Sequence, residues 1–172
     1  RGRAACAKMR PVGPGPRDGI CRRDESPVIV LTEAQEHAIH GAACSLVAAA
    51  ASRRPRRLAD AEWAGAERLV VLGAFVSLKR RGRLRGCCGS FGAPAALAEA
   101  VGLAACRTAT DDQRFPPVTP IELPHLDVEV WLLHSAAAVT CPAADRATAN
   151  VVGRHGLYLQ RGSAGGVLLP GV

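Results

Sequence analysis

The sequence contains few lysines and few aromatic residues. Only Lys8 and Lys79 among its 22 basic residues are lysines, and aromatic residues make up 3% of the 172-residue chain. So few lysines leave little scope for Schiff-base chemistry, which needs a lysine amine. Base stacking needs aromatic side chains interleaved with basic ones. No such pattern occurs, so we do not expect the folded part to bind nucleic acid.

Long apolar runs are also absent. No segment approaches the ~18 apolar residues of a membrane-spanning helix, and the first residues lack the apolar centre of a signal peptide. The seven cysteines are an odd number without regular spacing, which favours a reducing compartment over a disulfide framework. We therefore predict a cytoplasmic protein that has no membrane partner.

Several catalytic and metal-binding signatures are missing. The chain has no Cys-x-x-Cys pair, no Gly-x-Ser-x-Gly elbow and no Walker loop. His37 and His40 are three residues apart, but they share a helix face with Glu33 and Glu36, as in a solvated stripe. The sequence predicts no metal site and no cofactor.

Charge and composition separate the first 26 residues from the rest. They hold seven basic and three acidic residues, a net charge of +4 out of +7 for the whole chain. Their proline and glycine content cannot bury enough apolar surface to offset chain entropy. We predict a disordered basic linker over residues 1–26 and one domain over 27–172. The start at Arg1 indicates a piece of a longer chain.

The remaining sequence indicates helices alongside hairpins. Thr32 and Gln35 have the spacing of a capping box before an alanine-rich helical pattern, which predicts a helix over 33–52. The further predicted elements are a hairpin of strands 75–78 and 83–88 with its turn at Arg81–Gly82, a helix over 95–108 with Pro94 in its first turn, a strand over 125–134, a loop over 136–150, and a last hairpin of strands 156–160 and 167–169. This order favours an α+β fold with a mixed or antiparallel sheet and flanking helices.

The segment 84–91 places two adjacent cysteines between glycines at the end of a predicted strand. Glycines weaken a strand, so their number indicates a bend or a close approach to the backbone. Cys87 is a candidate nucleophile, and a small buried residue beneath the bend is the alternative. Cys88 faces the other side of the strand, where we expect core packing. The amide groups around Gly86 and Gly89, at a strand-to-helix junction, are candidate contacts for an anionic substrate.

Two arginines are candidate substrate-binding residues. Arg85, two positions before Cys87, is expected on the same side of an extended strand. Arg114 lies in a proline-braced loop, from which its planar guanidinium can hold a carboxylate or phosphate. The alternative for Arg114 is an ion pair with Asp111 or Asp112.

Two further residues are candidates for proton transfer. Glu129 lies on the outer face of a core-forming strand, where it can act as a general base or pair with Arg85; plain solvent exposure is the alternative. His155, between Arg154 and Gly156, can transfer protons at neutral pH, unless it is only a surface residue of a turn.

These residues lie in segments that resemble a known family. The run Leu84-Arg85-Gly86-Cys87-Cys88-Gly89 differs at one position from that family's Leu-Arg-Gly-Cys-Ile-Gly signature. The other similar segments are, in order, 73–79, 112–119, 122–130, and 152–159 with 168–172. Over residues 31–172 the chain resembles the AMME chromosomal region gene 1 domain, called AmmeMemoRadiSam system protein A in bacteria and archaea. It departs at Cys88, where the family has an aliphatic residue, and at its end, where family members continue with a further helical segment.

The resemblance implies a larger and a smaller lobe with the signature in the cleft between them. The residues expected to line this cleft are Arg85, Cys87, Arg114 and Glu129. The resemblance also implies a pathway shared with Memo-like and radical-SAM proteins, and a Memo-like domain can precede the linker. Two functions stay open: an enzyme or small-molecule-binding protein acting on an anionic metabolite through Cys87, or a regulatory module that binds a protein or nucleic acid and has a structural Cys87.

Overall fold

The computed structural model of the protein describes residues 2–12, 29–54, 56–136, 138–139, 142–145, 153, 155–161 and 164–170. The chain divides into two compact units. The first comprises Arg1–Cys6 and Val30–Leu132, and the second comprises Ala7–Ile29 and Leu133–Val172. Of the candidate site residues, only His155 belongs to the second unit.

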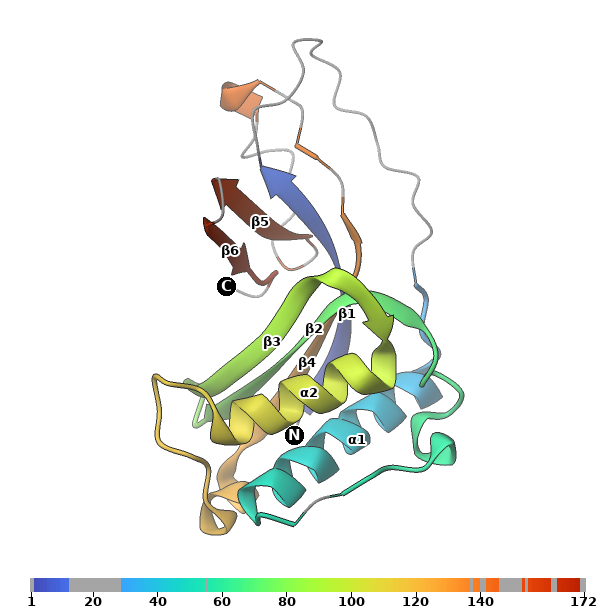
Figure 1. Cartoon of the computed structure of the whole chain (residues 1–172), viewed down its shortest axis with the longest axis vertical. Helices are drawn as coiled ribbons and strands as arrows, with labels where there is room; N and C mark the ends of the chain where they lie inside the picture. Colours follow the sequence, from blue (N-terminus) through green and yellow to red (C-terminus); the bar gives the residue numbers. More distant parts are fainter. Residues whose placement is uncertain are drawn as a thin grey trace. The chain divides into compact units, whose positions relative to one another are not determined.

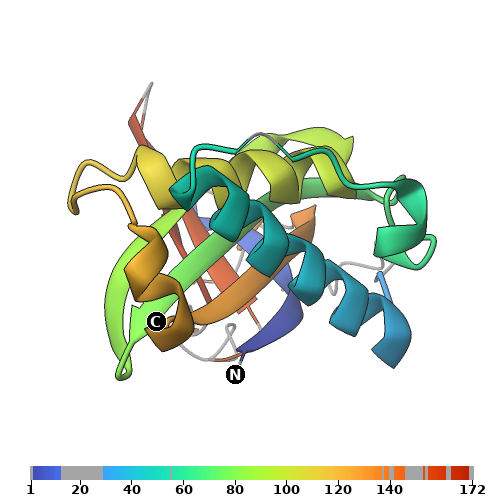
Figure 2. The ribbon, with the colours of Figure 1, turned by 90° about the horizontal axis from the view of Figure 1, so that it is seen from below.

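The first unit contains two helices that cover one side of a sheet. Its elements in chain order are α1 (Glu33–Ala51), the 3-10 turn η1 (Asp60–Trp63), β2 (Val70–Arg80), β3 (Arg83–Ala96), α2 (Leu97–Thr110), the 3-10 helix η2 (Pro120–His125) and the part up to Leu132 of β4 (Asp127–Ala136). β2 lies between β3 and β4, so β3 is an outer strand. Figures 1 and 2 show α1 and α2 on the same side of these strands.

The core of the first unit lies between the helices and the sheet. α2 packs on β2 and β3, and α1 packs on α2. Val76 and Leu78 of β2, Val101 of α2 and Val130 of β4 are completely buried there. Because successive strand residues point to opposite faces, the residues between these buried ones point away from the helices.

Helix α1 begins where its capping sequence predicts. The Thr32 hydroxyl accepts a hydrogen bond from the Gln35 amide at 3.2 Å, and the Gln35 side chain accepts one from the Thr32 amide at 3.0 Å. Two N–H groups of the first turn are thereby satisfied without tertiary contacts. The helix ends at Ala51, one residue before the predicted end.

The hairpin of β2 and β3 has the predicted turn but longer strands. Arg81 and Gly82 have φ of 51° and 76°, as in the left-handed two-residue turns that match strand twist. Leu78 pairs with Gly86 and Lys79 with Leu84, which leaves Arg85 without a partner on β2. Arg85 therefore sits in a β-bulge, where side-chain alternation is interrupted.

The strand β3 continues past the predicted helix start. Ala95 and Ala96 pair with Val71 and Val70, so α2 begins only at Leu97 and Pro94 lies in the strand rather than in a helical turn. The Leu97 amide instead donates to the Leu69 carbonyl at 2.8 Å. The expectation that the cysteine segment adjoins the helix was therefore wrong, because strand pairing overrides the glycine and proline signals.

The segment before β4 also differs from the prediction. Residues Pro120–His125 form the 3-10 helix η2, an element that the sequence did not predict. Its last turn is closed by the Leu126 amide, which donates to the Leu123 carbonyl at 3.2 Å. β4 consequently starts at Asp127, two residues after the predicted strand start.

The second unit contains a parallel strand pair that composition did not predict. β1 (Gly2–Val12), whose residues from Ala7 onward belong to this unit, runs parallel to β5 (His155–Arg161), with Lys8 opposite His155 and Val12 opposite Leu159. These residues were expected to belong to a linker, but pairing with β5 gives their backbone groups partners that a composition argument does not include. The rest of the expected linker, Arg1 and residues 13–26, lies outside the described residues.

A final hairpin completes the second unit. β5 pairs antiparallel with β6 (Ala164–Leu168), as predicted, and β6 starts earlier because Gly165 and Gly166 also pair with β5. Most of the predicted loop over 136–150 lies outside the described residues, and Ala143–Asp145 forms a short 3-10 turn. Antiparallel hairpins, a parallel pair and packed helices together confirm the α+β class.

Within the described residues, no helix is both long enough and apolar enough to cross a membrane.

Candidate functional site

The candidate site lies on the sheet face opposite the helices. The Thr108 hydroxyl of α2 donates to the Val76 carbonyl at 2.9 Å and accepts from the Cys88 amide at 2.9 Å, which identifies the helix side of both strands. Ser77 and Cys87 are register partners one position along. Their side chains therefore point to the other face, as the alternation argument predicts for Cys87 and Cys88.

Cys87 has a hydroxyl donor next to its sulfur. The Ser77 Oγ lies 3.2 Å from the Cys87 Sγ and donates a hydrogen bond to it. Ser77 is buried, whereas Cys87 is half-buried. The hydroxyl of the neighbouring strand is therefore aimed at the sulfur. The sequence did not single out Ser77, because one serine in an apolar strand carries no local signal.

At the edge of β3 that faces away from β2, an ion pair holds the backbone of Cys87. Its amide donates to Asp112 Oδ2 at 2.8 Å, and its carbonyl accepts from Arg114 Nη2 at 2.8 Å. Arg114 also donates to both carboxylate oxygens of Asp112, at 2.9 and 2.8 Å. We name these three residues the Asp112 clamp. It supplies one acceptor and one donor at the free edge of β3.

The two charges of the Asp112 clamp differ in exposure. The Asp112 side chain is 6% exposed and that of Arg114 is 56% exposed. Hydrogen bonds from the Arg114 side chain hold the pKa of Asp112 well below its usual range, against the opposing effect of burial, and the amide of Cys87 assists. Asp112 is one of the two partners that the sequence allowed for Arg114.

Arg85 leaves the bulge to hold the proline-braced loop. Its Nε and Nη2 donate to the two carboxylate oxygens of Glu122 at 2.8 and 3.1 Å. Its Nη1 and Nη2 also donate to the carbonyls of Pro116 and Pro117, at 3.0 and 3.4 Å. With side-chain exposures of 14% for Arg85 and 16% for Glu122, this is a sheltered, bidentate pair of the stronger kind.

The Phe115 ring connects the two arginines. The guanidinium carbons of Arg85 and Arg114 lie 6.0 and 5.7 Å from its centroid, within range of a cation–π interaction. Arg85, Arg114 and the Cys87 backbone thus belong to one contact network, although the bulge breaks the alternation that was expected to place Arg85 beside the Cys87 side chain.

Glu129 has a different partner from the one considered. Lys79 Nζ lies 2.7 Å from Glu129 Oε1, with the two side chains 35% and 27% exposed. Both residues lie between core positions of β2 and β4, on the face that also carries Ser77 and Cys87. The pair gives this face a carboxylate base and a cation. The cation, Lys79, is the only lysine after residue 8.

The two signature glycines are required by close packing. A Cβ at Gly86 would lie 3.1 Å from the Thr108 carbonyl oxygen, and one at Gly89 would overlap the Ala74 carbonyl and the Phe75 ring. The amide groups of Cys87 and Cys88 donate to Asp112 and Thr108. These two amides, expected to meet an anion, already have partners inside the chain.

His155 opens β5 of the second unit and is half-buried. Across the described parts of both units, no three His, Cys, Asp or Glu side chains converge in a group that could hold a metal ion.

The Arg85–Glu122 pair makes stability sensitive to acid. The Arg85 side chain is the main cause that lowers the pKa of Glu122 to about 2. Because this folded-state pKa lies below the ordinary ~4.3 of the unfolded chain, the stabilisation is complete above about pH 5 and is lost as the pH falls towards 2. We expect Glu122→Gln to lower the free energy of unfolding at pH 7 by about 2 kcal/mol and to flatten its decline in acid. Urea titrations from pH 3 to 7 measure both effects.

The control for this prediction is Glu99→Gln, which removes an exposed carboxylate from the first turn of α2. It should change stability by no more than about 0.5 kcal/mol. Equal effects of the two substitutions would mean that the Arg85–Glu122 pair contributes nothing specific.

The fold and the site together define an α+β domain in which a proline-braced loop is fastened to an Arg-Gly-Cys strand by two carboxylate–guanidinium pairs. The sequence model of the AMMECR1 family matches residues 33–172. The chain belongs to the AMMECR1 family, which confirms the resemblance found in its signature.

Archaeal proteins are similar to this chain. A protein of Methanothermobacter thermautotrophicus is 44% identical over 101 residues, which are 58% of this chain and 53% of the relative. A protein of Thermococcus onnurineus is 37% identical over 126 residues, 70% of this chain and 61% of the relative. The crystal structure of the uncharacterized protein PH0010 from Pyrococcus horikoshii has a TM-score of 0.63 at 30% identity, and the match covers 78% of this chain and 68% of that one.

The chain spans about half the length of the first two curated relatives, 53% and 50%.

Proposed function

We propose that the chain is part of a thiol-dependent enzyme or small-molecule-binding protein that acts on an anionic metabolite, with Cys87 as its reactive group. The observation that carries this proposal is the hydrogen bond from Ser77 Oγ to Cys87 Sγ at 3.2 Å. The buried Ser77 hydroxyl holds the half-buried sulfur in a defined direction on the sheet face. The backbone of Cys87 is fixed on both sides, so the sulfur is held in one place for attack.

In this proposal the two arginines have different roles. Arg85 is a positioning residue, because its donors already reach Glu122 and two loop carbonyls. Arg114 is more than half exposed despite its bond to Asp112, so it is the arginine that would contact an anionic group of the substrate. Because the Asp112 carboxylate partly neutralises the charge of Arg114, this arginine would hold such an anion weakly and exchange it readily.

The remaining candidates complete the proposal. Glu129, which shares with Cys87 the sheet face opposite the helices, would act as the general base, and its Lys79 partner at 2.7 Å would position its carboxylate. Gly86 and Gly89 allow the strand to lie close to its neighbours. His155 as a proton-transfer residue, and Memo-like and radical-SAM proteins as partners, remain proposals drawn from the sequence and the family resemblance.

Thiol reactivity tests the proposal, with Cys106 as an internal reference. Cys106 is an exposed residue, but partial burial of its thiol is the main cause that raises the pKa of that thiol. The negative charge of Asp111 is the second cause. We expect native Cys87 to react with iodoacetamide at pH 7 roughly tenfold faster than Cys106, because only thiolates are alkylated at an appreciable rate. Peptide mass spectrometry after timed quenching measures both rates in one sample.

Two substitutions connect reactivity with function. Cys87→Ser should keep the fold and abolish thermal shifts caused by metabolites, since an alcohol cannot replace the thiolate. Cys88→Ile should keep those shifts, because Cys88 packs on the helix side, where the family has an aliphatic residue, and overpacking there costs about 1 to 3 kcal/mol. Ser77→Ala should slow alkylation of Cys87 while leaving Cys106 unchanged.

A regulatory interaction module is the second candidate function, and a specific observation favours it. Both candidate arginines, Arg85 and Arg114, are already bound to carboxylates of the same chain, as expected of residues that organise a loop. If native Cys87 reacts no faster than Cys106, and Cys87→Ser lowers the melting temperature without removing any ligand response, Cys87 is structural and this second function is the better one.

A further inference from the structure

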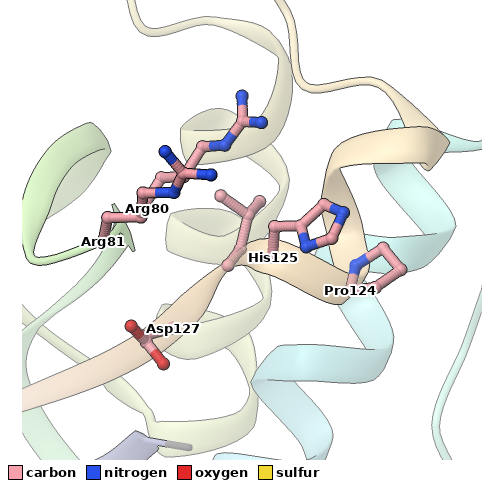
Figure 3. Close-up of a pocket in the computed structure, with 6 residues that line it drawn as sticks. Arg80, Arg81, Pro124, His125 and Asp127 are labelled. Carbon is pink, nitrogen blue, oxygen red and sulfur yellow. The ribbon is translucent and has the colours of Figure 1, made fainter.

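A pocket of about 360 Å³ lies beside the turn of the β2–β3 hairpin, and Cys87 is not one of the residues that line it. It is lined by Arg80, Arg81, Pro124, His125, Leu126 and Asp127. Figure 3 shows Arg80 and Arg81 on one side of it, His125 and Pro124 on the other, and the Asp127 carboxylate below. Its volume lies within the range of small-ligand sites, and all its lining residues belong to the first unit.

The arginines of this pocket lack the partners that the other two have. Among the described residues, the side chains of Arg80 and Arg81 take part in no hydrogen bond or ion pair. Arg85 and Arg114, by contrast, both bind carboxylates. Two guanidinium groups without such a bond, at one pocket that Asp127 also lines, are suited to an anion brought from outside.

The local backbone makes these positions unfavourable for arginine in the absence of a ligand. Arg80 lies directly opposite Arg83 in the register of the hairpin, and like charges opposite each other destabilise a strand pair. Arg81 has φ of 51°, a left-handed conformation that asparagine or glycine adopts at lower cost. A bound anion would offset the repulsion between Arg80 and Arg83. It would also contact the Arg81 side chain, whose direction is set by the tight turn.

The other lining groups indicate the rest of the ligand. Asp127 is half-buried at the start of β4 and already takes part in an interaction within the chain. The remaining lone pairs of a carboxylate can accept hydrogen bonds from hydroxyl groups, whereas its charge repels a second anion. Pro124 and Leu126 add apolar surface beside it. The combination fits a molecule with an anionic end and a hydroxylated end.

We propose that this pocket binds the phosphate monoester of a small polyhydroxylated molecule, with the phosphate on Arg80 and Arg81 and the hydroxyl groups near Asp127 and His125. Arginine holds phosphate through pairs of N–H donors at charge-assisted strength. The proposal does not depend on the role of Cys87, so either can fail without the other.

Calorimetric titration of the whole chain with ribose 5-phosphate, inorganic phosphate and ribose tests this proposal. We expect ribose 5-phosphate to bind more tightly than inorganic phosphate, and ribose not to bind. Arg80→Gln and Arg81→Asn should each weaken ribose 5-phosphate binding by about tenfold or more, through loss of one charge-assisted contact. Arg81→Asn is suited to the left-handed turn, so its melting temperature should not fall.

The matched control is Arg107→Gln, which removes one positive charge from an exposed position of α2 without touching the pocket lining. It should leave affinity within about twofold, because a general charge effect is screened by salt. The proposal is overturned if ribose 5-phosphate fails to bind at about 10 mM, a level far weaker than ordinary metabolite sites, or if Arg107→Gln weakens binding as much as Arg80→Gln does.

Discussion

Asp112→Asn is expected to lower the free energy of unfolding by about 3 kcal/mol at pH 7. The carboxylate accepts hydrogen bonds from the Cys87 amide, the Arg114 amide and the Arg114 guanidinium, at 2.8 to 3.1 Å. An asparagine presents one acceptor and one donor group, so at least one buried N–H faces another donor. Hydrogen bonds to charged groups contribute about 1.5 to 3 kcal/mol each, and the exposure of Arg114 reduces its share.

The same substitution should change the acid dependence of stability. The pKa of Asp112 is depressed in the folded protein, so its contribution is present above the unfolded pKa of ~3.9 and is lost as the pH falls below that value. Guanidinium chloride titrations at pH 7 and pH 3 should therefore show a smaller difference for Asp112→Asn than for the native chain.

Asp111→Asn is the matched control, because Asp111 is the exposed neighbour at the end of α2. Its effect should stay within about 0.5 kcal/mol. If Asp112→Asn is equally mild, the Asp112 clamp does not fix the strand, and the argument that it positions Cys87 fails with it.

Gly89→Ala is expected to destabilise the fold even more, by about 3 to 4 kcal/mol. The added methyl group would overlap the Ala74 carbonyl oxygen and the Phe75 ring on the neighbouring strand β2. The ring can rotate, but the carbonyl belongs to the backbone of a central strand, so β2 and β3 must separate. Overpacking costs at the upper end of the usual 1 to 3 kcal/mol, or beyond, are reached when backbone has to move.

Gly41→Ala gives the comparison in the opposite direction. Gly41 is an exposed residue within α1, and a Cβ there would meet nothing within 4 Å. Alanine in an exposed helix position stabilises by about 0.5 to 1 kcal/mol relative to glycine. Thermal melts of both variants should move in opposite directions, and a Gly89→Ala protein as stable as the native one would contradict the close strand packing.

Short-range sequence signals were sufficient to predict the start of α1 and the turn between β2 and β3. The Thr32 and Gln35 side chains fix the start of α1 without tertiary contacts, and the Arg81–Gly82 turn joins two strands close in sequence. Both features depend on residues at most four positions apart, so the sequence predicts them correctly.

Long-range pairing explains the elements that the sequence did not predict. β1 is stabilised by partners about 147 positions away along the chain, as in the pair Lys8 and His155, and proline and glycine composition carries no information on such a partner. The extension of β3 to Ala96 depends in the same way on pairing with Val70. Composition describes what a segment can do alone, and here other segments decide.

The sequence singled out candidate site residues, but it did not predict which contacts they make. Arg85, Arg114 and Cys87 do belong to one network, but the bulge at Arg85 redirects its side chain to Glu122, and nothing in the residue order around Arg85 reveals a bulge. Glu122 lies 37 residues later, and Lys79, which holds Glu129, lies 50 residues before it. Partner choice at these distances is set by the folded topology.

The Asp112 clamp has a consequence for association between molecules. An outer strand offers open amide and carbonyl groups, onto which a strand of another copy can dock and grow into an aggregate. At Cys87 both groups are covered by side chains of the following loop. Removing the Asp112 carboxylate would uncover this stretch without touching the helices, so the Asp112→Asn protein should self-associate at β3 at neutral pH while its helices remain intact.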